Sequence, residues 1–390
     1  MFAIFSTLRK LLRPIGFVAA AGALLSACQP VSLNNGSGDF GSGKPVKVAL
    51  LLPQSDAEVA AIAQSLENAA RLALVQQPDL RVELRVYDTA GQAATAAEQA
   101  RVAVADGAQI ILGPLRADAV NAAGLAVAQS GVNVLGFSNN ASIAGGNVFI
   151  LGQTFSSVAD RLTEYARMKG RNSAVILHSR DIAGESGRVA FESAAALHGL
   201  RIVASEGYEL SISGVSEAAQ RAAASLTAAQ ADTIFITPPA QNAAMPMLLS
   251  QLPSNGVDPA FVQFGALSRL DARPDLFSLP GAEGIWFAVP DMARQNAFNA
   301  SYNASYGSPA HPLAGLAYDG ISAIGALGKT GQGGILTREA LTSASFMGAR
   351  GVFRLLSDGS NQRALAVASV QDKQMVILDP APNSLDGSGF

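Results

Sequence analysis

Along most of the chain, segments with the apolar pattern of a strand alternate with segments in which apolar residues recur at helical spacing. Residues 46–52 are almost continuously apolar, which is typical of a parallel strand that is buried on both faces. Apolar residues then recur at helical spacing through 59–73, alternate with polar ones over 81–87, and return to an alanine-rich helical pattern over 89–106. A strand, a helix and a further strand follow at 108–112, 118–130 and 132–135. This βαβ succession predicts a doubly wound parallel sheet.

A second series of the same kind follows the first. Helical patterns at 157–169, 187–198 and 217–228 alternate with strand patterns at 173–177, 201–208 and 232–237. Further along, the patterns predict a strand at 284–289, a helix at 312–327 and three antiparallel strands at 351–355, 363–370 and 374–378. Because the alanine-rich helix and strand of 96–113 resemble those of 218–236, we expect an α/β protein with two doubly wound lobes.

The N-terminus predicts a lipid anchor. Cys28 is the only cysteine of the chain, and it follows an apolar run that Arg9, Lys10 and Arg13 precede. Leu25-Ser26-Ala27-Cys28 resembles a lipobox, in which a signal peptide (1–27) is removed and the cysteine is lipidated. Gln29, in place of an aspartate, favours the periplasmic side of the outer membrane. The alternative is an uncleaved signal anchor. Residues 28–44 are rich in Gly, Ser and Asn and predict a flexible linker.

Composition and motifs argue against several functions. The net charge is −3 with no basic stripe, so nucleic acid is not an expected partner. Residues 38–44 spell G-x-x-x-x-G-K, but Pro45 follows where a P-loop needs Ser or Thr. His178, His198 and His311 are scattered and have no thiol partner for zinc. We therefore expect no metal, no cofactor and no enzymatic activity.

Five phrases, in order, resemble the leucine/isoleucine/valine-binding branch of the type I periplasmic binding proteins. They span about residues 46–378 and are Val48–Pro53, Tyr87–Gly91, Gly107–Pro114, Ala317–Gly320 and Gly351–Gly359. Within that branch, Gly113-Pro114-Leu115 and the segment Asn133–Asn139 look closer to the penicillin-binding protein activators. Those proteins are lipoproteins that stimulate peptidoglycan synthases, but this chain lacks the N-terminal helical repeats of the best-known ones.

The resemblance implies two lobes joined by three crossing segments that act as a hinge. We expect the crossings near Leu151-Gly152-Gln153, Phe287-Ala288-Val289 and Ser343-Ala344-Ser345. The expected division is 45–152 plus 288–344 for lobe 1, 153–287 plus 345–380 for lobe 2, and 381–390 for a tail.

A cleft between the lobes is expected at the carboxyl ends of the strands. The candidates for ligand contact follow strand ends in both lobes: Gln54, Leu115, Arg116, Ser138, Asn139 and Asn140 in the first, and His178, Ser179, Arg180 and Asp181 in the second. The alternative is that these are solvated loop residues, or that Asn139 and Asn140 shape a turn.

Two departures from the family bear on function. Ala117 stands where the family usually has a serine, and Asp181-Ile182-Ala183-Gly184 lacks the usual tyrosine. A free α-amino acid is therefore a less suitable ligand, and the sequence favours an activator that docks on a peptidoglycan synthase. The alternative is the substrate-binding lipoprotein of an ABC importer for amino acids, amides or short peptides. A sensor that binds a small polar ligand, a fragment of the cell wall, in the cleft would combine both functions.

Overall fold

The computed structural model describes residues 45–238, 242–329 and 336–385. The expected signal peptide, Cys28, the linker up to residue 44 and the second half of the expected tail lie outside the described residues. The fold class that the sequence predicts is confirmed: parallel strands alternate with helices in two separate sheets.

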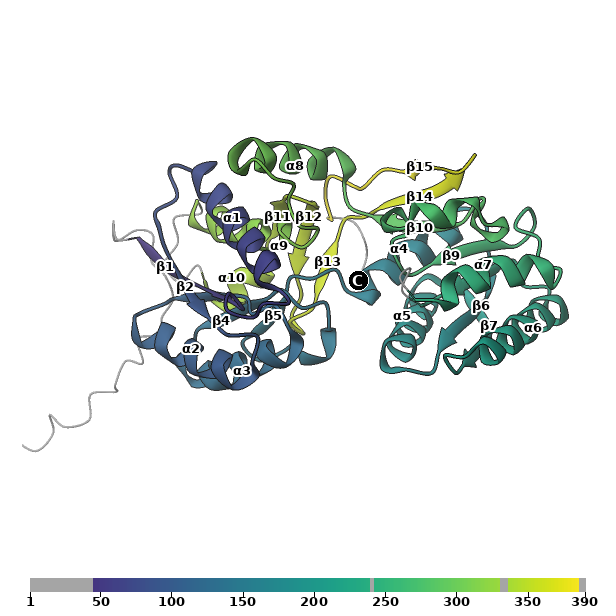
Figure 1. Cartoon of the computed structure of the whole chain (residues 1–390), viewed down its shortest axis with the longest axis horizontal. Coiled ribbons are helices and arrows are strands. Elements are labelled where there is room, and N and C mark those ends of the chain that lie inside the picture. The colour runs from purple at the N-terminus through teal and green to yellow at the C-terminus, as the bar shows by residue number, and fades with distance from the viewer. Residues whose placement is uncertain (1–44, 239–241, 330–335, 386–390) are drawn as a thin grey trace, which may run out of the picture. The chain divides into compact units, whose positions relative to one another are not determined.

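The first sheet is entirely parallel, with the strand order β2-β1-β3-β4-β5. Its strands are β1 (Val46–Leu52), β2 (Val82–Asp88), β3 (Ile110–Leu112), β4 (Asn133–Gly136) and β5 (Val148–Ile150). The helices that pack on it are α1 (Ala60–Val75), α2 (Ala93–Ala105), α3 (Ala117–Val127) and α9 (Gly315–Gly328). In Figure 1, α2 and α3 lie side by side beneath this sheet.

The apolar run of β1 is buried on both faces of the first sheet. Val48, Leu50 and Leu52 belong to the hydrophobic cluster that α1 and α9 complete, whereas Ala49 and Leu51 belong to the cluster beneath α2 and α3. Successive side chains of a strand point to opposite faces, so the part of β1 that is buried on both sides, Val48–Leu52, carries no polar residue. All five side chains are at most 1% exposed.

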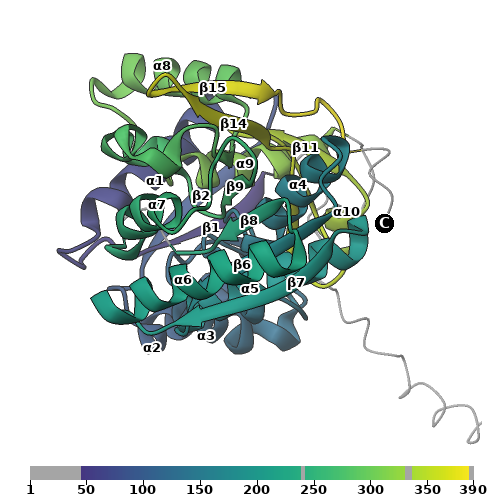
Figure 2. The same cartoon turned by 90° about the vertical axis from the view of Figure 1, so that its right-hand side faces the viewer.

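The second sheet is mixed, with the order β15-β14-β10-β9-β8-β6-β7. Its strands are β6 (Ser173–Ser179), β7 (Arg201–Tyr208), β8 (Thr233–Ile236), β9 (Gln263–Ala266), β10 (Trp286–Val289), β14 (Ala366–Gln371) and β15 (Gln374–Asp379). One face packs on α6 (Ile212–Ala229) and α7 (Ala244–Ser254), and the other on α4 (Phe155–Met168) and α5 (Ile182–His198). Figures 1 and 2 show the antiparallel strands β14 and β15 side by side, in yellow.

The chain returns to the first lobe between β10 and β14. This return contains α8 (Met292–Tyr306), α9, α10 (Arg338–Thr342) and a small antiparallel sheet of β11 (Ser345–Gly348), β12 (Gly351–Leu355) and β13 (Asn361–Arg363). The crossings fall at residues 151–154, 290–291 and 364–365, between elements that pack in different lobes.

The third crossing differs from the expectation of Ser343-Ala344-Ser345, which would place 345–363 in lobe 2. Phe346 of β11 and Phe353 of β12 are at most 1% exposed and pack in the cluster of β1, α1 and α9. The expected lobe boundary at 344/345 is therefore wrong, because this hairpin completes the first hydrophobic core.

A buried ion pair stabilises the return into the first lobe. Asp319 of α9 is 0% exposed and accepts hydrogen bonds from the backbone N–H of Ala349 and from Nη1 of Arg363, both at 2.8 Å. Nε of Arg363 also donates to the carbonyl oxygen of Leu151, at 3.2 Å. Both charges are thus paired and hydrogen-bonded, as buried charges must be.

The described residues lack two kinds of feature. None of their helices combines the length and the apolar character that crossing a membrane requires. Within 45–238, 242–329 and 336–385, no group of three or more His, Cys, Asp or Glu side chains is arranged to hold a metal ion.

Candidate functional site

A cavity of about 650 Å³ lies where strand ends of both sheets meet. In the first lobe its wall follows β3 and β4, and in the second lobe it follows β9 and the start of α4. The lining residues are Leu115, Arg116, Ala117, Phe137, Ser138, Asn139, Asn140, Gly152, Gln153, Phe155, Val158, Leu267, Arg269, Pro312, Leu313, Leu316 and Arg350. This position follows the rule that ligands of open parallel sheets bind beyond the carboxyl ends of the strands.

The predicted residues of the first lobe fall mostly at this cavity. Leu115, Arg116, Ser138, Asn139 and Asn140 line it. Gln54 does not; its Nε2 donates to Glu67 Oε2 at 2.9 Å, on the exposed surface. The strand-end argument therefore brings five of the six together, and their contact with a ligand stays a prediction.

Some of these side chains already have local partners. Ser138 Oγ accepts from the backbone N–H of Asn140, and Asn140 Oδ1 accepts from the N–H of Ser142, each at 3.0 Å. Arg116 Nη2 donates to Asp56 Oδ2 at 2.9 Å. The expected turn-forming role of Asn140 is thus present beside the cavity, and Arg116 already has an anionic partner.

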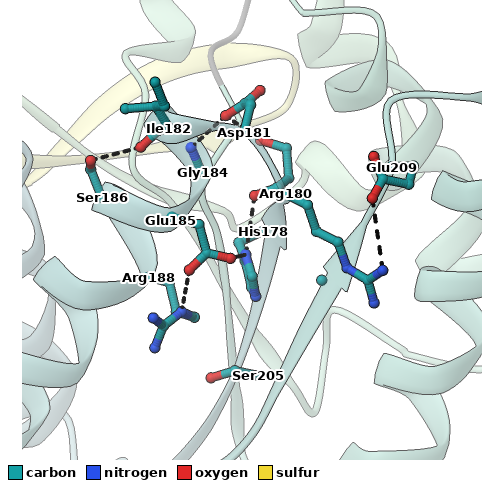
Figure 3. Close-up of polar contacts among 12 residues, drawn as sticks. His178, Arg180, Asp181, Ile182, Gly184, Glu185, Ser186, Arg188, Ser205 and Glu209 are labelled. Carbon is teal, nitrogen blue, oxygen red and sulfur yellow. Dashed lines mark hydrogen bonds and ion pairs between the residues drawn. The ribbon is translucent and has the colours of Figure 1, made fainter.

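The four predicted residues of the second lobe lie elsewhere, at the junction of β6 and α5 (Figure 3). His178 and Ser179 are the last residues of β6, not loop residues. Asp181 is the N-cap of α5, where Oδ1 accepts from the N–H of Gly184 at 2.7 Å. Arg180 points to Glu209, and Nη1 lies 3.8 Å from Glu209 Oε1. Asp181 therefore caps the start of α5, and none of the four residues lines the cavity.

His178 belongs to a small charged cluster at this junction. Its buried Nδ1 lies 3.1 Å from the carbonyl oxygen of Ser179 and 3.4 Å from Glu185 Oε1. Glu185 Oε2 in turn accepts from Arg188 Nε at 2.8 Å, as the dashed lines of Figure 3 show. This hydrogen bond from Arg188 holds the pKa of the Glu185 carboxyl below its ordinary value.

The sequence does not predict two arginines that line the cavity. Arg269 follows β9, and its Nε donates to Asp271 Oδ1 at 3.0 Å. Arg350 occupies the two-residue turn between β11 and β12, with the side chain 7% exposed. Its Nη2 donates to Gln153 Oε1 at 3.0 Å. Nothing in the sequence distinguishes this residue from an arginine on a solvated turn.

Burial shapes the charge of Arg350. Its pKa is lowered to about 9, first by burial and then by the nearby Arg363 and Arg269, against the opposing effects of Asp319 and Asp271. A guanidinium with that pKa is still protonated at neutral pH, so the cavity wall carries its positive charge. The residues that line the cavity in the described chain include no carboxylate, imidazole or thiol, so this wall offers no ordinary metal-ligand set.

Several solved structures share this fold. An ABC transporter substrate-binding protein from Sphaerobacter thermophilus is 18% identical, with 87% of this chain and 98% of that chain covered and a TM-score of 0.66. One from Desulfitobacterium hafniense, in complex with Leu, is 19% identical, with 86% and 100% covered and a TM-score of 0.62. A solute-binding protein from Rhodopseudomonas palustris BisB5, in complex with 3,4-dihydroxybenzoic acid, is 20% identical, with 87% and 98% covered and a TM-score of 0.56. At these identities the likeness shows the fold alone.

Sequence comparison gives the family. No curated protein matches the chain. The family profile described as "Periplasmic binding protein" matches residues 45–374, which span the first sheet, the second sheet up to β14 and all three crossings. The chain therefore belongs to the periplasmic binding protein family.

Proposed function

We propose that this protein is the substrate-binding component of a membrane transporter and takes up a small molecule in the cavity between the strand ends. The observation that carries the proposal is the cavity itself. It lies at the carboxyl ends of parallel strands and is lined from both lobes by apolar side chains with a few polar and charged ones. That mixture is typical of small-molecule sites, where apolar area supplies affinity and a few polar groups fix orientation.

The comparisons support this function over the one that the sequence favoured. The similar structures described above are named as substrate- or solute-binding proteins of ABC transporters. Activation of a peptidoglycan synthase has no support from the fold, the cavity or these comparisons. We therefore adopt the importer, which was the alternative in the sequence analysis, as the function.

The two-sided lining provides a mechanism. Leu115 and Ser138 come from the first lobe, and Phe155 and Leu267 from the second. A ligand that contacts the side chains of both lobes binds more tightly when the lobes are close together than when they are apart. It therefore stabilises the close arrangement, by the difference between its binding free energies for the two arrangements. A permease that recognises that arrangement would then distinguish the loaded protein from the empty one.

Family membership implies a location outside the cytoplasm. We keep lipidation of Cys28 as part of the proposal, since Leu25-Ser26-Ala27-Cys28 resembles a lipobox. Labelled palmitate should be incorporated into the wild-type chain and not into the Cys28→Ala variant. Equal labelling of the two would refute the anchor and leave the binding function unaffected.

The binding function is tested with the protein that begins after Cys28. A thermal-shift screen against amino acids, amides, short peptides and organic acids should produce at least one hit. A ligand at 100 times its Kd stabilises the native state by about 2.7 kcal/mol. If no compound raises the melting temperature, the transport function is refuted.

A matched pair of variants tests the location of the site. Leu115→Trp adds a large side chain to the cavity wall, whereas Leu125→Trp makes the same change at a residue of α3 that is 72% exposed. We expect the ligand-dependent shift to be lost in the first variant and kept in the second. If both variants keep the ligand-dependent shift in melting temperature, the binding site lies outside this cavity.

A further inference from the structure

We infer that the cavity binds an organic acid, that is, a ligand with an apolar body and a carboxylate group but no ammonium group. This inference rests on the proposed function and names the class of its substrate. It differs from the expectation of amino acids, amides or short peptides, and it follows from the charges and contacts of the cavity wall.

The wall carries charge of only one sign. Its charged side chains are Arg116, Arg269 and Arg350, and none of its described residues is an aspartate or a glutamate. Guanidinium groups match the geometry of a carboxylate and donate two parallel hydrogen bonds to it. The charge of the wall therefore selects an anion.

Arg350 is the arginine that lacks an anionic partner. Arg116 is paired with Asp56, and Arg269 is paired with Asp271. Arg350 forms no ion pair with any described residue, and its buried Nε has no hydrogen-bond partner among them. Asp271 and Asp319 act on it only from beyond ion-pair distance. A buried cation without a partner is unfavourable, and a ligand carboxylate would remove that penalty.

The rest of the wall is suited to an apolar body. Phe137 and Phe155 supply aromatic surface, and Val158, Leu267, Leu313 and Leu316 supply aliphatic surface. Burial of such surface against an apolar ligand supplies most of the affinity in sites of this kind.

The described wall offers no carboxylate to an ammonium group. An α-amino acid would need a carboxylate for its ammonium, because a charge left unpaired in a closed cavity is strongly unfavourable. The described lining contains none, and Ala117 provides no hydroxyl in its part of the wall. An acid that lacks the amino group avoids this penalty, whereas leucine does not.

Isothermal titration calorimetry with matched ligands tests the inference. The panel contains benzoate with benzamide, 3-phenylpropanoate with its primary amide, and 4-methylpentanoate with leucine, which differs from it by the amino group. We expect at least one acid to bind, and to bind at least tenfold more tightly than its partner. Leucine or an amide that binds as tightly as its matched acid would overturn the inference.

Variants separate recognition from structure. Arg350→Met keeps the length of the side chain and removes its charge. We expect it to lose at least tenfold in affinity for the acid while it gains or keeps affinity for the amide, a difference that a merely structural role would not produce. Arg101→Met is the control, because Arg101 lies outside the cavity and pairs with Glu98 on the surface. An equal loss for acid and amide in Arg350→Met would contradict the assignment.

The two failures are distinguishable. If the screen yields a bound zwitterion or cation, the transport function survives and the organic-acid inference fails. If no compound of any class binds, the transport function fails and the inference fails with it.

Discussion

Replacing Asp319 with asparagine tests how the buried ion pair of the first lobe contributes to stability. The carboxylate accepts one hydrogen bond from the N–H of Ala349 and one from Arg363, and both side chains of the pair are at most 3% exposed. Asparagine has one acceptor oxygen. If that oxygen keeps the bond to Ala349, the amide NH₂ faces the guanidinium, so two donors oppose each other.

The magnitude follows from burial. Removing one partner of a buried pair leaves an uncompensated charge and costs about 3–5 kcal/mol. A typical domain is stable by only about 5–15 kcal/mol, so the loss is a large share of the total. With an m-value of about 2 kcal/mol/M in urea, the unfolding midpoint should fall by about 1.5–2.5 M.

Urea unfolding followed by two probes checks this result. Far-UV circular dichroism reports both lobes, whereas Trp286, the only tryptophan of the chain, reports the second sheet. The first lobe should unfold at lower urea in Asp319→Asn, and the tryptophan signal will show whether the second lobe follows.

The control for this experiment is Glu98→Gln. Glu98 forms a 3.4 Å ion pair with Arg101, and both side chains are more than half exposed. Exposed pairs contribute about 0–1 kcal/mol. If Asp319→Asn is as mild as Glu98→Gln, the reasoning from burial is refuted.

Three other outcomes are expected. Leu50→Ala, at a residue that is 0% exposed, should cost about 2–5 kcal/mol in urea unfolding; a cost below 1 kcal/mol would mean that the core closes around the missing atoms. Gly152→Ala would place a Cβ 2.4 Å from the carbonyl oxygen of Ser138. We therefore expect a loss of about 1–3 kcal/mol in the free energy of unfolding by scanning calorimetry, and weaker ligand binding by titration calorimetry. The hydrogen bond from Arg188 lowers the pKa of Glu185, so its contribution to stability is present above the unfolded pKa and is lost as the pH falls through the lowered value. Carbon NMR of labelled glutamate should show that Arg188→Ala raises the pKa of Glu185, and an unchanged value would contradict this account.

The sequence predicted the sheets where burial dominates the pattern. β1 and β6 are buried on both faces, so their apolar runs are visible. β9 was missed because it contains Gln263, which is 9% exposed and donates to the carbonyl oxygens of Phe264 and Gly284. A polar side chain satisfied by backbone atoms gives no strand pattern, although its environment is that of a core.

The position of the third crossing could not be predicted from local sequence patterns. The hairpin of β11 and β12 buries Phe346 and Phe353, and these rings lie 5.5 Å apart. Each lobe has its own apolar core. Its pattern predicts that it will be buried, but not in which core.

The candidate site could also be predicted only in part. The strand-end rule located Leu115 and Ser138, because β3 and β4 end at the cavity. In the second lobe it selected the end of β6, whereas the cavity lies near the end of β9, so the result depended on a strand that the sequence did not reveal. Arg350 reaches the wall from a hairpin turn, and the rule does not consider turns.

The three crossings have a mechanical consequence, because hydrogen bonds connect them to one another. Asn361, just before the third crossing, donates through Nδ2 to the carbonyl oxygens of Ile150 and Gly152, at 2.7 Å each, on either side of the start of the first. Asp291 of the second crossing donates its N–H to the carbonyl oxygen of Arg350 at 3.2 Å, and Arg350 Nη2 donates to Oε1 of Gln153, in the first crossing, at 3.0 Å. Segments joined in this way cannot slide independently, so we expect the three crossings to move together as one hinge. Rotation of one lobe against the other about that hinge would then be the easiest large motion of the protein, and sliding of one lobe past the other the hardest.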